Sequence, residues 1–403
     1  MEAYSLLPGL TDDVAMECLL RVPYRYHSQM AFVCRSWKSL ISSSSFYKER
    51  QRLSFAEHLL CLVQPLPTTH IHTLEPIPSS DLVTQQQQPS YGLTIYNATK
   101  QTWRPVSNQS SAFQVPMFCH CVALPLSNKL VLLGGWDPQT LQPVSTVYVF
   151  NFVTHCLAQA ASMSKARSFF ACAAVGDSRV YVAGGHDSQK NALKSAEVYD
   201  AEKDEWTTLP DMDQERDECH GMSWREESKF WVVSGYGTEC QGRFRRDVEC
   251  YDPGTNSWST VQNVWPFATL SPRCTAAVNG SSRHEWHWFI AREQLHGMDL
   301  GEESEEWDVQ RSVVQVPEGL RGSSLLSVVS SGLDAGGCDQ VFVMGGSSNR
   351  PGQVSSFTSN DSGASPCCDG EGAFSLGRDK KWRHVHTPSG FSGFPYSASY
   401  LVI

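Results

Sequence analysis

The chain has 403 residues, of which 41% are hydrophobic and only 18% are charged, with 29 glycines and an aromatic share of 11%. This length exceeds one ordinary core, and the composition is too apolar for a disordered chain. The formal net charge is −10 and the basic residues are scattered, which argues against a nucleic-acid partner. The composition favours many short strands joined by tight turns.

The first segment, MEAYSLLPGLTDDVAMECLL, has acids within its apolar stretch and no basic region before it. No run in the sequence approaches the roughly 18 apolar residues of a membrane span. We therefore expect no membrane partner and a location in the cytoplasm, the nucleus or both. The cysteines are expected to be free thiols, because neither Cys119-His120-Cys121 nor Cys367-Cys368 has a second pair at zinc-site spacing. We expect no metal and no cofactor.

Residues 10–41 follow a helical period rather than strict alternation. A first helix is expected to begin at Thr11 and to end before Pro23. A second is predicted as one continuous helix with a single apolar stripe, formed by Met30, Val33, Cys34, Trp37 and Ile41. Two or three such short helices cannot bury this apolar surface alone, so part of it should face the chain's own β domain or another protein.

The segment LLPGLTDDVAMECLLRVPYRYHSQMAFVCRSWKSL resembles an F-box, which is marked by a Leu-Pro opening, a first helix ending in Leu-x-x-Pro, and a later Val-Cys-Arg-x-Trp. Thr11 stands where similar sequences usually have Pro, but Thr can also begin a helix. The resemblance implies that residues 1–52 form a helical module that binds a Skp-type adaptor and, through it, a cullin. The resemblance implies that core and adaptor-binding contacts come from Leu10, Val14, Leu19, Leu20, Pro23, Val33, Cys34 and Trp37, and the sequence does not say which side each faces.

Residues 53–403 carry a repeat with a period near 50. Glycine-containing pairs end short apolar runs at regular distances, at Gly134-Gly135, Gly184-Gly185, Ser234-Gly235 and Gly345-Gly346. A Tyr is followed seven residues later by a Trp in three repeats, at Tyr96 and Trp103, Tyr199 and Trp206, and Tyr251 and Trp258. An Arg also recurs once per repeat, at Arg167, Arg216, Arg273 and Arg321. In one degenerate repeat, His155 or Cys156 is expected to replace the Trp.

These marks resemble the kelch repeat, in which about 50 residues build a four-stranded blade. The predicted fold is mainly β, a six-bladed kelch β-propeller preceded by a small α-helical F-box. The first blade begins midway, at His58 to Val63, so residues 396–403 are expected to supply its missing strand. Insertions at 65–90 and 347–372 interrupt the period and are predicted to be solvated loops.

In such a propeller, the loops between second and third strands and the loops between blades share one face, which is the default binding surface. The residues predicted for this substrate-binding rim are His186, Arg216, His220, Tyr236, Arg243, Arg245, Arg246 and Arg273. The arginines that recur by blade can instead be structural. Arg243, Arg245 and Arg246 do not recur, and they would form a basic patch for an acidic partner segment.

Nearly the whole chain resembles the plant kelch-domain F-box family, most closely at 167–172, 182–187, 209–212 and 215–219. The resemblance implies a non-catalytic, substrate-recruiting subunit of a Skp–cullin–F-box ubiquitin ligase. Similar members target phenylalanine ammonia-lyase, and the same group is implicated in turnover of type-B response regulators of cytokinin signalling. Two alternatives remain: a kelch scaffold without ubiquitination, and a copper oxidase resembling galactose oxidase with His186, His220 and Tyr236 near one rim.

Overall fold

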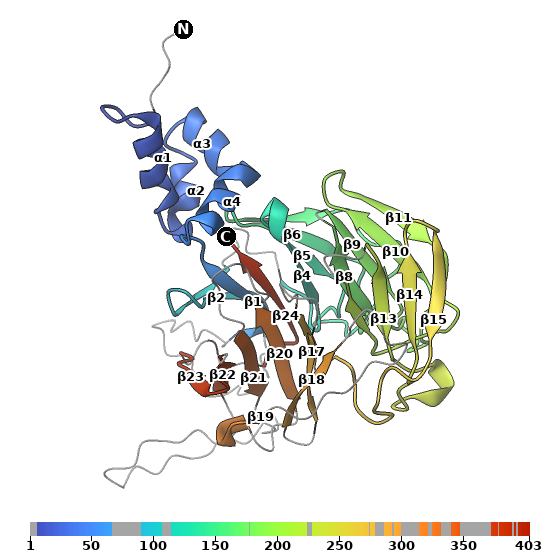
Figure 1. The fold of residues 1–403 in the computed structure, drawn as a ribbon. Coiled ribbons are helices and arrows are strands. Elements are labelled where there is room, and N and C mark those ends of the chain that lie inside the picture. Colours follow the sequence, from blue (N-terminus) through green and yellow to red (C-terminus); the bar gives the residue numbers. More distant parts are fainter. Residues whose placement is uncertain are drawn as a thin grey trace, which may run out of the picture.

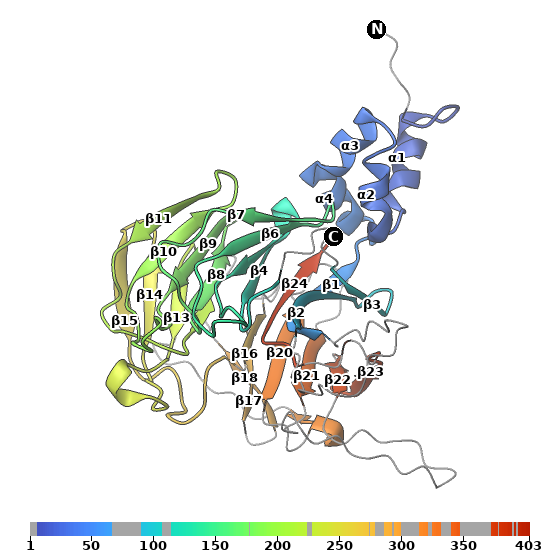
Figure 2. The same cartoon turned by 180° about the vertical axis from the view of Figure 1, so that it is seen from behind.

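The computed structural model describes residues 6–66, 90–106, 114–176, 178–223, 228–273, 275–278, 286–291, 294–299, 314–320, 325–331, 340–346, 372–377, 379–388, 391 and 394–403. A helical module at the N-terminal end is joined to a larger body of β-sheets (Figure 1; Figure 2). Most of the two expected insertions (67–89 and 347–371), together with Arg321, lies outside the described residues. No described helix has the length and apolar character to cross a membrane.

The helical module consists of α1 (Asp12–Leu20), η1 (Tyr24–Tyr26), α2 (His27–Met30), α3 (Arg35–Ile41) and α4 (Ser44–Arg52). The continuous second helix predicted from the apolar stripe is wrong, because the chain leaves the helix between α2 and α3. Cys34 is extended (φ −159°, ψ 168°), and its Sγ accepts a hydrogen bond from the Trp37 amide at 3.4 Å, which caps α3. Thr11 occupies the corresponding position before α1 but makes no side-chain cap hydrogen bond.

In the described residues the strands form six antiparallel sheets of four. Written from one edge to the other, the first sheet is β24 (Ser397–Val402), β1 (His58–Leu66), β2 (Ser90–Asn97) and β3 (Thr102–Pro105), and the second is β4 (His120–Leu124), β5 (Lys129–Leu133), β6 (Val147–Asn151) and β7 (Cys156–Ala160). The third sheet is β8 (Ala171–Val175), β9 (Arg179–Ala183), β10 (Ala196–Asp200) and β11 (Glu205–Leu209), and the fourth is β12 (His220–Met222), β13 (Phe230–Val233), β14 (Val248–Asp252) and β15 (Ser257–Val261). The fifth sheet is β16 (Thr275–Val278), β17 (Trp286–Ala291), β18 (Gln294–Asp299) and β19 (Val314–Gln315), and the sixth is β20 (Leu325–Ser331), β21 (Gln340–Gly346), β22 (Gly372–Leu376) and β23 (Trp382–Val385). Short 3-10 turns η2 (Pro125–Ser127), η3 (Thr238–Cys240) and η4 (Glu318–Leu320) lie between strands. The predicted fold class, mainly β with a preceding helical module, is confirmed.

The sheets follow one another around a centre through their innermost strands. β24 contacts β4, β4 contacts β8 and β8 contacts β12, while β16 contacts β20 and β20 contacts β24. β24 also pairs antiparallel with β1, with Leu401 opposite Leu59 and Ser397 opposite Val63. The last strand of the chain therefore lies in the same sheet as the first, and it covers the edge of β1 that would otherwise be open.

The repeated Tyr and Trp connect neighbouring sheets. Within a sheet they pair across two strands, as in Tyr199 and Trp206 with ring centroids 5.1 Å apart. The indole N–H then donates to a carbonyl of the preceding sheet, from Trp206 to Ala161 at 2.7 Å and from Trp258 to Pro210 at 2.8 Å. The same bond runs from Trp103 to His386 at 2.9 Å, between the first and the last sheet. The repeated Trp thus links one sheet to the preceding one through its indole hydrogen bond.

The sheet β4–β7 lacks this Trp, and the strand register places the substitution at a different residue from the predicted one. Phe150 pairs with Leu157 as Tyr199 pairs with Trp206, so Leu157 replaces the Trp, whereas His155 lies in the preceding turn with a φ of 55°. The prediction of His155 or Cys156 at this position is wrong by one or two residues.

Candidate functional site

The helical module has a small core, which contains two of the residues predicted to bind the adaptor. Leu19 and Leu20 are each 2% exposed and pack with Ile41 and Phe46. Side chains this deeply covered cannot contact another protein, so the prediction of Leu19 and Leu20 as adaptor contacts is wrong. Helical periodicity selects apolar residues, but it does not say which side of a short helix faces inward.

Two other predicted contacts, Pro23 and Trp37, are half-buried and serve the module's own structure. Pro23 stands at the start of η1. The Trp37 indole donates a hydrogen bond to the Leu6 carbonyl at 2.8 Å. This bond holds the chain that precedes α1 against α3.

The remaining predicted contacts are exposed. Leu10 is 42% exposed, Val14 47% and Val33 61%, and the side chain of Cys34 is exposed as well. Phe32, which the sequence reasoning missed, is 89% exposed. Leu10, Val14, Phe32 and Val33 are called the helical-module patch below. Exposed aromatic and aliphatic side chains gathered on one small module usually mark an interface.

A buried carboxylate joins the helical module to the propeller. Glu57, 3% exposed, accepts hydrogen bonds from the Tyr24 amide at 2.7 Å and from the Asn97 side chain at 2.5 Å, and it pairs with Arg50 at 3.5 Å. Arg50 also donates to the carbonyl of Phe55 at 2.9 Å. The module therefore has a fixed orientation on the propeller, because a slight rotation would leave buried polar groups without partners.

The module occupies the end of the propeller opposite the predicted rim. Asn97 and His155 adjoin turns between third and fourth strands, and they contact Glu57 and Ser28 respectively. Because the strands are antiparallel, the loops between second and third strands emerge at the other end. The rim is thus directed away from the helical module, as the overall views show (Figure 1).

Two of the recurring arginines, Arg167 and Arg216, are buried within the propeller. Arg216 is 0% exposed and forms ion pairs with Asp247 and with Glu249, the latter at 2.9 Å. Arg167 is 1% exposed and likewise donates to Glu197 at 3.1 Å and to the carbonyl of Gly184 at 2.9 Å. Arg216 therefore holds a loop at the base of the rim, and its prediction as a substrate contact is wrong.

The double glycine marks the place where these loops approach each other. Gly184 and Gly185 have φ of 71° and 81°, and a Cβ on them would lie 2.5 Å from the Arg216 carbonyl and 2.4 Å from the Ser168 carbonyl. Only glycine allows both this conformation and this approach.

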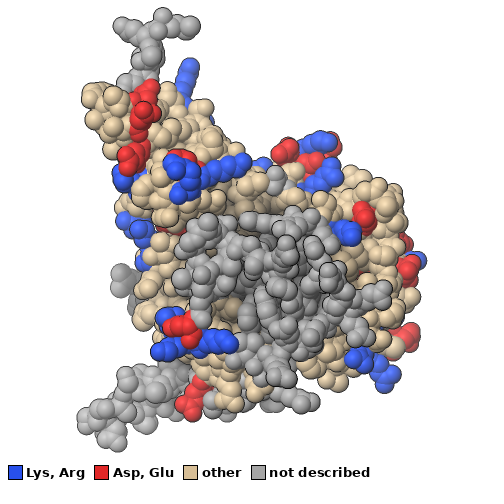
Figure 3. All heavy atoms as spheres, in the orientation of Figure 1, with Lys and Arg blue, Asp and Glu red and all other residues tan. Residues whose placement is uncertain are grey.

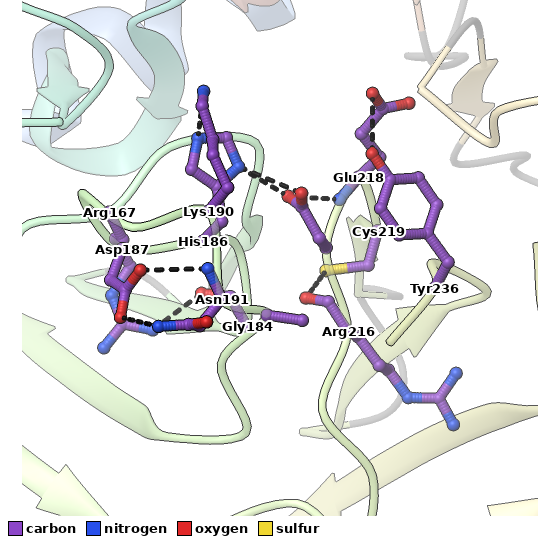
Figure 4. A network of polar contacts seen from close by, with 12 residues as sticks. Arg167, Gly184, His186, Asp187, Lys190, Asn191, Arg216, Glu218, Cys219 and Tyr236 are labelled. Carbon is purple, nitrogen blue, oxygen red and sulfur yellow. Dashed lines mark hydrogen bonds and ion pairs between the residues drawn. The ribbon is translucent and has the colours of Figure 1, made fainter. Parts of the chain in front are cut away.

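His186 and Lys190 form a polar chain on the rim (Figure 4). His186 Nδ1 lies 2.9 Å from Asp217 Oδ1, and its Nε2 lies 3.2 Å from the Lys190 ammonium. His186 itself is only 2% exposed, so the group that the rim presents to solvent is Lys190, which is exposed. Lys190 Nζ also lies 3.5 Å from the centre of the Trp136 ring. The sequence reasoning found His186 but missed Lys190 and Trp136.

Tyr236, predicted for the same rim, is 9% exposed and donates to Glu218 at 3.1 Å. Burial, followed by the nearby Asp217 and Glu218 charges, raises the pKa of its phenol well above the usual value. The hydroxyl is therefore a neutral donor within the loop framework.

Arg273 meets two histidines at the start of the innermost strands. One of its terminal nitrogens (Nη1) lies 3.2 Å from His120 Nε2, and its guanidinium lies over the Phe169 ring at 4.9 Å. Burial and the Arg273 charge lower the pKa of His220 to about 3, and the same causes lower that of His120 well below the usual value. Both rings are neutral at physiological pH, so Arg273 supplies the positive charge here.

The predicted basic patch lies in the loop between β13 and β14. Arg243 and Arg246 are exposed and Arg245 is half-buried. Arg246 Nε donates to the Trp265 carbonyl at 3.4 Å. On the face drawn in Figure 3, basic and acidic side chains are interspersed among the coloured residues. The role of the patch stays a prediction.

The described residues do not provide the ligand set of a copper oxidase. His186 and Tyr236 are bonded to Asp217 and Glu218, and among the described residues no group of three or more His, Cys, Asp or Glu side chains is placed to hold a metal ion. The geometry instead offers two surfaces for macromolecules, the helical-module patch and the rim.

Comparison with known proteins gives two family matches, to the F-box domain over residues 7–49 and to the KLHDC2/KLHL20/DRC7 Kelch-repeats domain over residues 83–285. The F-box/kelch-repeat protein SKIP20 of Arabidopsis thaliana is 43% identical to this chain, covering 99% of it and 97% of that protein. Two more proteins from the same plant carry this description. At2g44130 is 40% identical over 100% of this chain and 97% of its own, and At1g80440 is 38% identical over 64% and 69%.

Proposed function

The chain belongs to the F-box/kelch-repeat proteins, and on that basis we propose that it is the substrate-recognition subunit of a Skp–cullin–F-box ubiquitin ligase. An F-box implies binding of a Skp1-type adaptor, and a kelch domain implies binding of a target. The chain needs no catalytic group in this role, because the conjugating enzyme and the RING subunit carry the chemistry. Its contribution is proximity, which raises the effective concentration of the target's lysines.

The helical-module patch is the observation that supports this proposal most directly. Phe32 and Val33 are 89% and 61% exposed on a module that is otherwise well packed. Exposing such side chains is unfavourable unless a partner covers them. The cover that we propose is the Skp1-type adaptor, with Leu10 and Val14 as the neighbouring contacts.

We propose phenylalanine ammonia-lyase as the target, which would make the chain a negative regulator of phenylpropanoid synthesis. The resemblance of segments 167–172, 182–187 and 209–212 to the plant family supports this choice. Type-B response regulators are the second candidate. Both targets are consistent with a cytoplasmic or nuclear location. Co-precipitation of each purified candidate with the wild-type chain, and the half-life of each in plant cells with and without it, distinguishes the two.

The adaptor role is tested by co-purification with a recombinant Skp1-type adaptor. Two apolar side chains that become fully buried contribute roughly 3–6 kcal/mol, so the double variant Val14→Asp, Phe32→Asp should bind at least about 100-fold more weakly. Both side chains are exposed, and the variant should therefore fold normally. Leu141→Asp is the matched control, because Leu141 is 52% exposed on the propeller and Asp tolerates its φ of 55°. A wild-type chain that captures no adaptor would favour the scaffold alternative.

A further inference from the structure

Lys190 is an ordered cation on the rim. Its ammonium lies between the Trp136 ring, at 3.5 Å, and His186 Nε2, at 3.2 Å. Asp217 lies 2.9 Å from His186 Nδ1, and this contact orients the ring so that Nε2 faces Lys190. Figure 4 shows Lys190 beside the His186 ring, with the contact between their nitrogens drawn as a dashed line. Two contacts thus hold a side chain that is usually mobile on a protein surface.

Lys190 forms no ion pair with a carboxylate in the described part of the chain. The nearby Asp217 charge favours its ammonium form, but Asp217 is already bonded to His186 and to the Glu218 amide at 2.8 Å. An ammonium makes much stronger hydrogen bonds to a carboxylate than to a neutral imidazole. Because Lys190 is held in place, a carboxylate that binds it loses little side-chain entropy.

Next to Lys190 lies a floor of half-exposed aromatic rings. Phe118 and Phe169 are 5.0 Å apart between ring centroids, and Phe169 is 6.4 Å from Trp136. Tyr396 extends the floor at 4.6 Å from Phe118. Arg273 lies over Phe169 at 4.9 Å, which places a second cation beside the same rings. The floor is therefore apolar in its middle, with two cations, Lys190 and Arg273, at its margins.

The backbone under this floor is strained in a repeated way. Phe118 and Phe169 have φ of 55° and 54°, two residues before the first residues of β4 and β8. Glu218 stands in the same register before β12, with a φ of 50°. The left-handed conformation costs a non-glycine residue about 1–2 kcal/mol, so the surrounding loops must impose it. They do so through paired backbone bonds, such as those between Ser168 and His186 at 3.0 and 3.4 Å.

We propose that this site, defined by Lys190, Trp136, Phe118, Phe169 and Arg273, recognises an acidic segment of the target protein. A carboxylate of the segment binds Lys190, and a neighbouring apolar side chain packs on the rings of Phe118 and Phe169. The inference rests on the proposed function. In it, the target segment is recognised both by its carboxylate and by its apolar side chain. It differs from the basic-patch prediction, which places the acidic segment at Arg243, Arg245 and Arg246.

The test is a selection from a random 12-residue peptide library displayed on phage, using the full chain bound to a recombinant Skp1-type adaptor. We expect enrichment of peptides with Asp or Glu within three residues of Leu, Ile, Phe or Tyr. Affinities of the enriched peptides are then measured by fluorescence anisotropy, with the thermal melting of every variant as a check on folding.

Lys190→Glu should weaken peptide binding by about 10- to 100-fold, as expected for loss of a charge-assisted hydrogen bond, and Lys190→Arg should retain most of it. Lys203→Glu is the matched control, because Lys203 is exposed in a turn at the opposite end of the strands. Phe169→Asn removes the ring while tolerating the φ of 54°, and it should weaken binding about 10-fold.

Three results would overturn the site: no enrichment, enrichment of peptides without acids, or acidic peptides whose affinity depends on Arg243 and Arg246 and not on Lys190. Capture of the adaptor is scored separately in the same preparations. If the wild type fails to hold the adaptor, the proposed function fails whatever the peptides show. If it holds the adaptor but shows no Lys190-dependent acidic preference, only the site fails.

Discussion

The pairing of the last strand with the first leads to a sharp prediction about stability. Deletion of residues 396–403 removes β24 and the residue after it, and with them Leu401, Val402 and Ile403, which are 0%, 8% and 0% exposed. Burial of such side chains stabilises a fold by about 1.5–3 kcal/mol each, or roughly 5–9 kcal/mol together. A domain has a total stability of about 5–15 kcal/mol, so this loss alone approaches the whole of it.

The deletion also affects the neighbouring sheet. Ser397 and Ser399 accept hydrogen bonds from the amides of Cys121 and Ala123 on β4, at 3.0 and 2.9 Å. Without β24, these amides and the edge of β1 would lack partners, and an open edge promotes aggregation. We therefore expect the chain 1–395 to be insoluble or to unfold without a cooperative transition.

Circular dichroism melting and the soluble fraction after expression measure this effect. Leu401→Ala provides a milder version and should cost about 2–5 kcal/mol, whereas Leu126→Ala, at a site that is 45% exposed, should change the unfolding free energy by less than about 0.5 kcal/mol. A truncated chain with the melting temperature and solubility of the wild type would refute the reasoning.

Two further predictions concern buried ionisable groups. Arg216→Met leaves the buried Glu249 without its partner and should cost about 3–5 kcal/mol in urea unfolding, while Arg243→Met, at an exposed site, should be nearly neutral; equal effects would contradict the structural role of Arg216. Burial, with a smaller effect of the Arg50 charge, lowers the pKa of His27 to about 3, so the unfolded chain binds the extra proton below about pH 6.5 and stability falls as the pH falls. Between pH 6.5 and pH 5 this amounts to roughly 2 kcal/mol, and His27→Gln should show a correspondingly weaker acid dependence in denaturant unfolding.

The sequence predicted the fold class well because the repeat marks are local. A glycine pair after an apolar run and a Tyr seven residues before a Trp each report on contacts within one sheet or between adjacent sheets. The break between α2 and α3 was not predictable in this way. Met30, Val33, Cys34 and Trp37 have the spacing of one helix, but Cys34 is extended and its thiol caps α3. The regular spacing of apolar residues therefore does not correspond to a continuous helix here.

The candidate site was less predictable, because its contacts join residues far apart in sequence. Lys190 meets Trp136 of the preceding repeat, and Arg273 meets His120, which lies three repeats earlier in the chain. Residue type alone also could not separate Arg216 from Arg243. One is a buried partner of two acids and the other is exposed, and only the packing distinguishes them.

In one sheet, the departure from the repeat coincides with a contact to the helical module. In the sheet β4–β7, Leu157 replaces the Trp that elsewhere bonds to the preceding sheet, and Phe150 and Leu157 instead pack in the same cluster as Leu19 and Tyr24 of the helical module. His155, in the turn before it, contacts Ser28 at 3.2 Å.

A second difference between the repeats lies at the opposite end of the strands, just before β4 and β8. The register position that is Glu218 before β12 is Phe118 before β4 and Phe169 before β8. A structural requirement of the turn would be met as well by Asn or Gly in each blade, so two aromatic side chains at a strained position need another reason. The target-binding surface that we propose, on the side of the ring away from the helical module, would supply it.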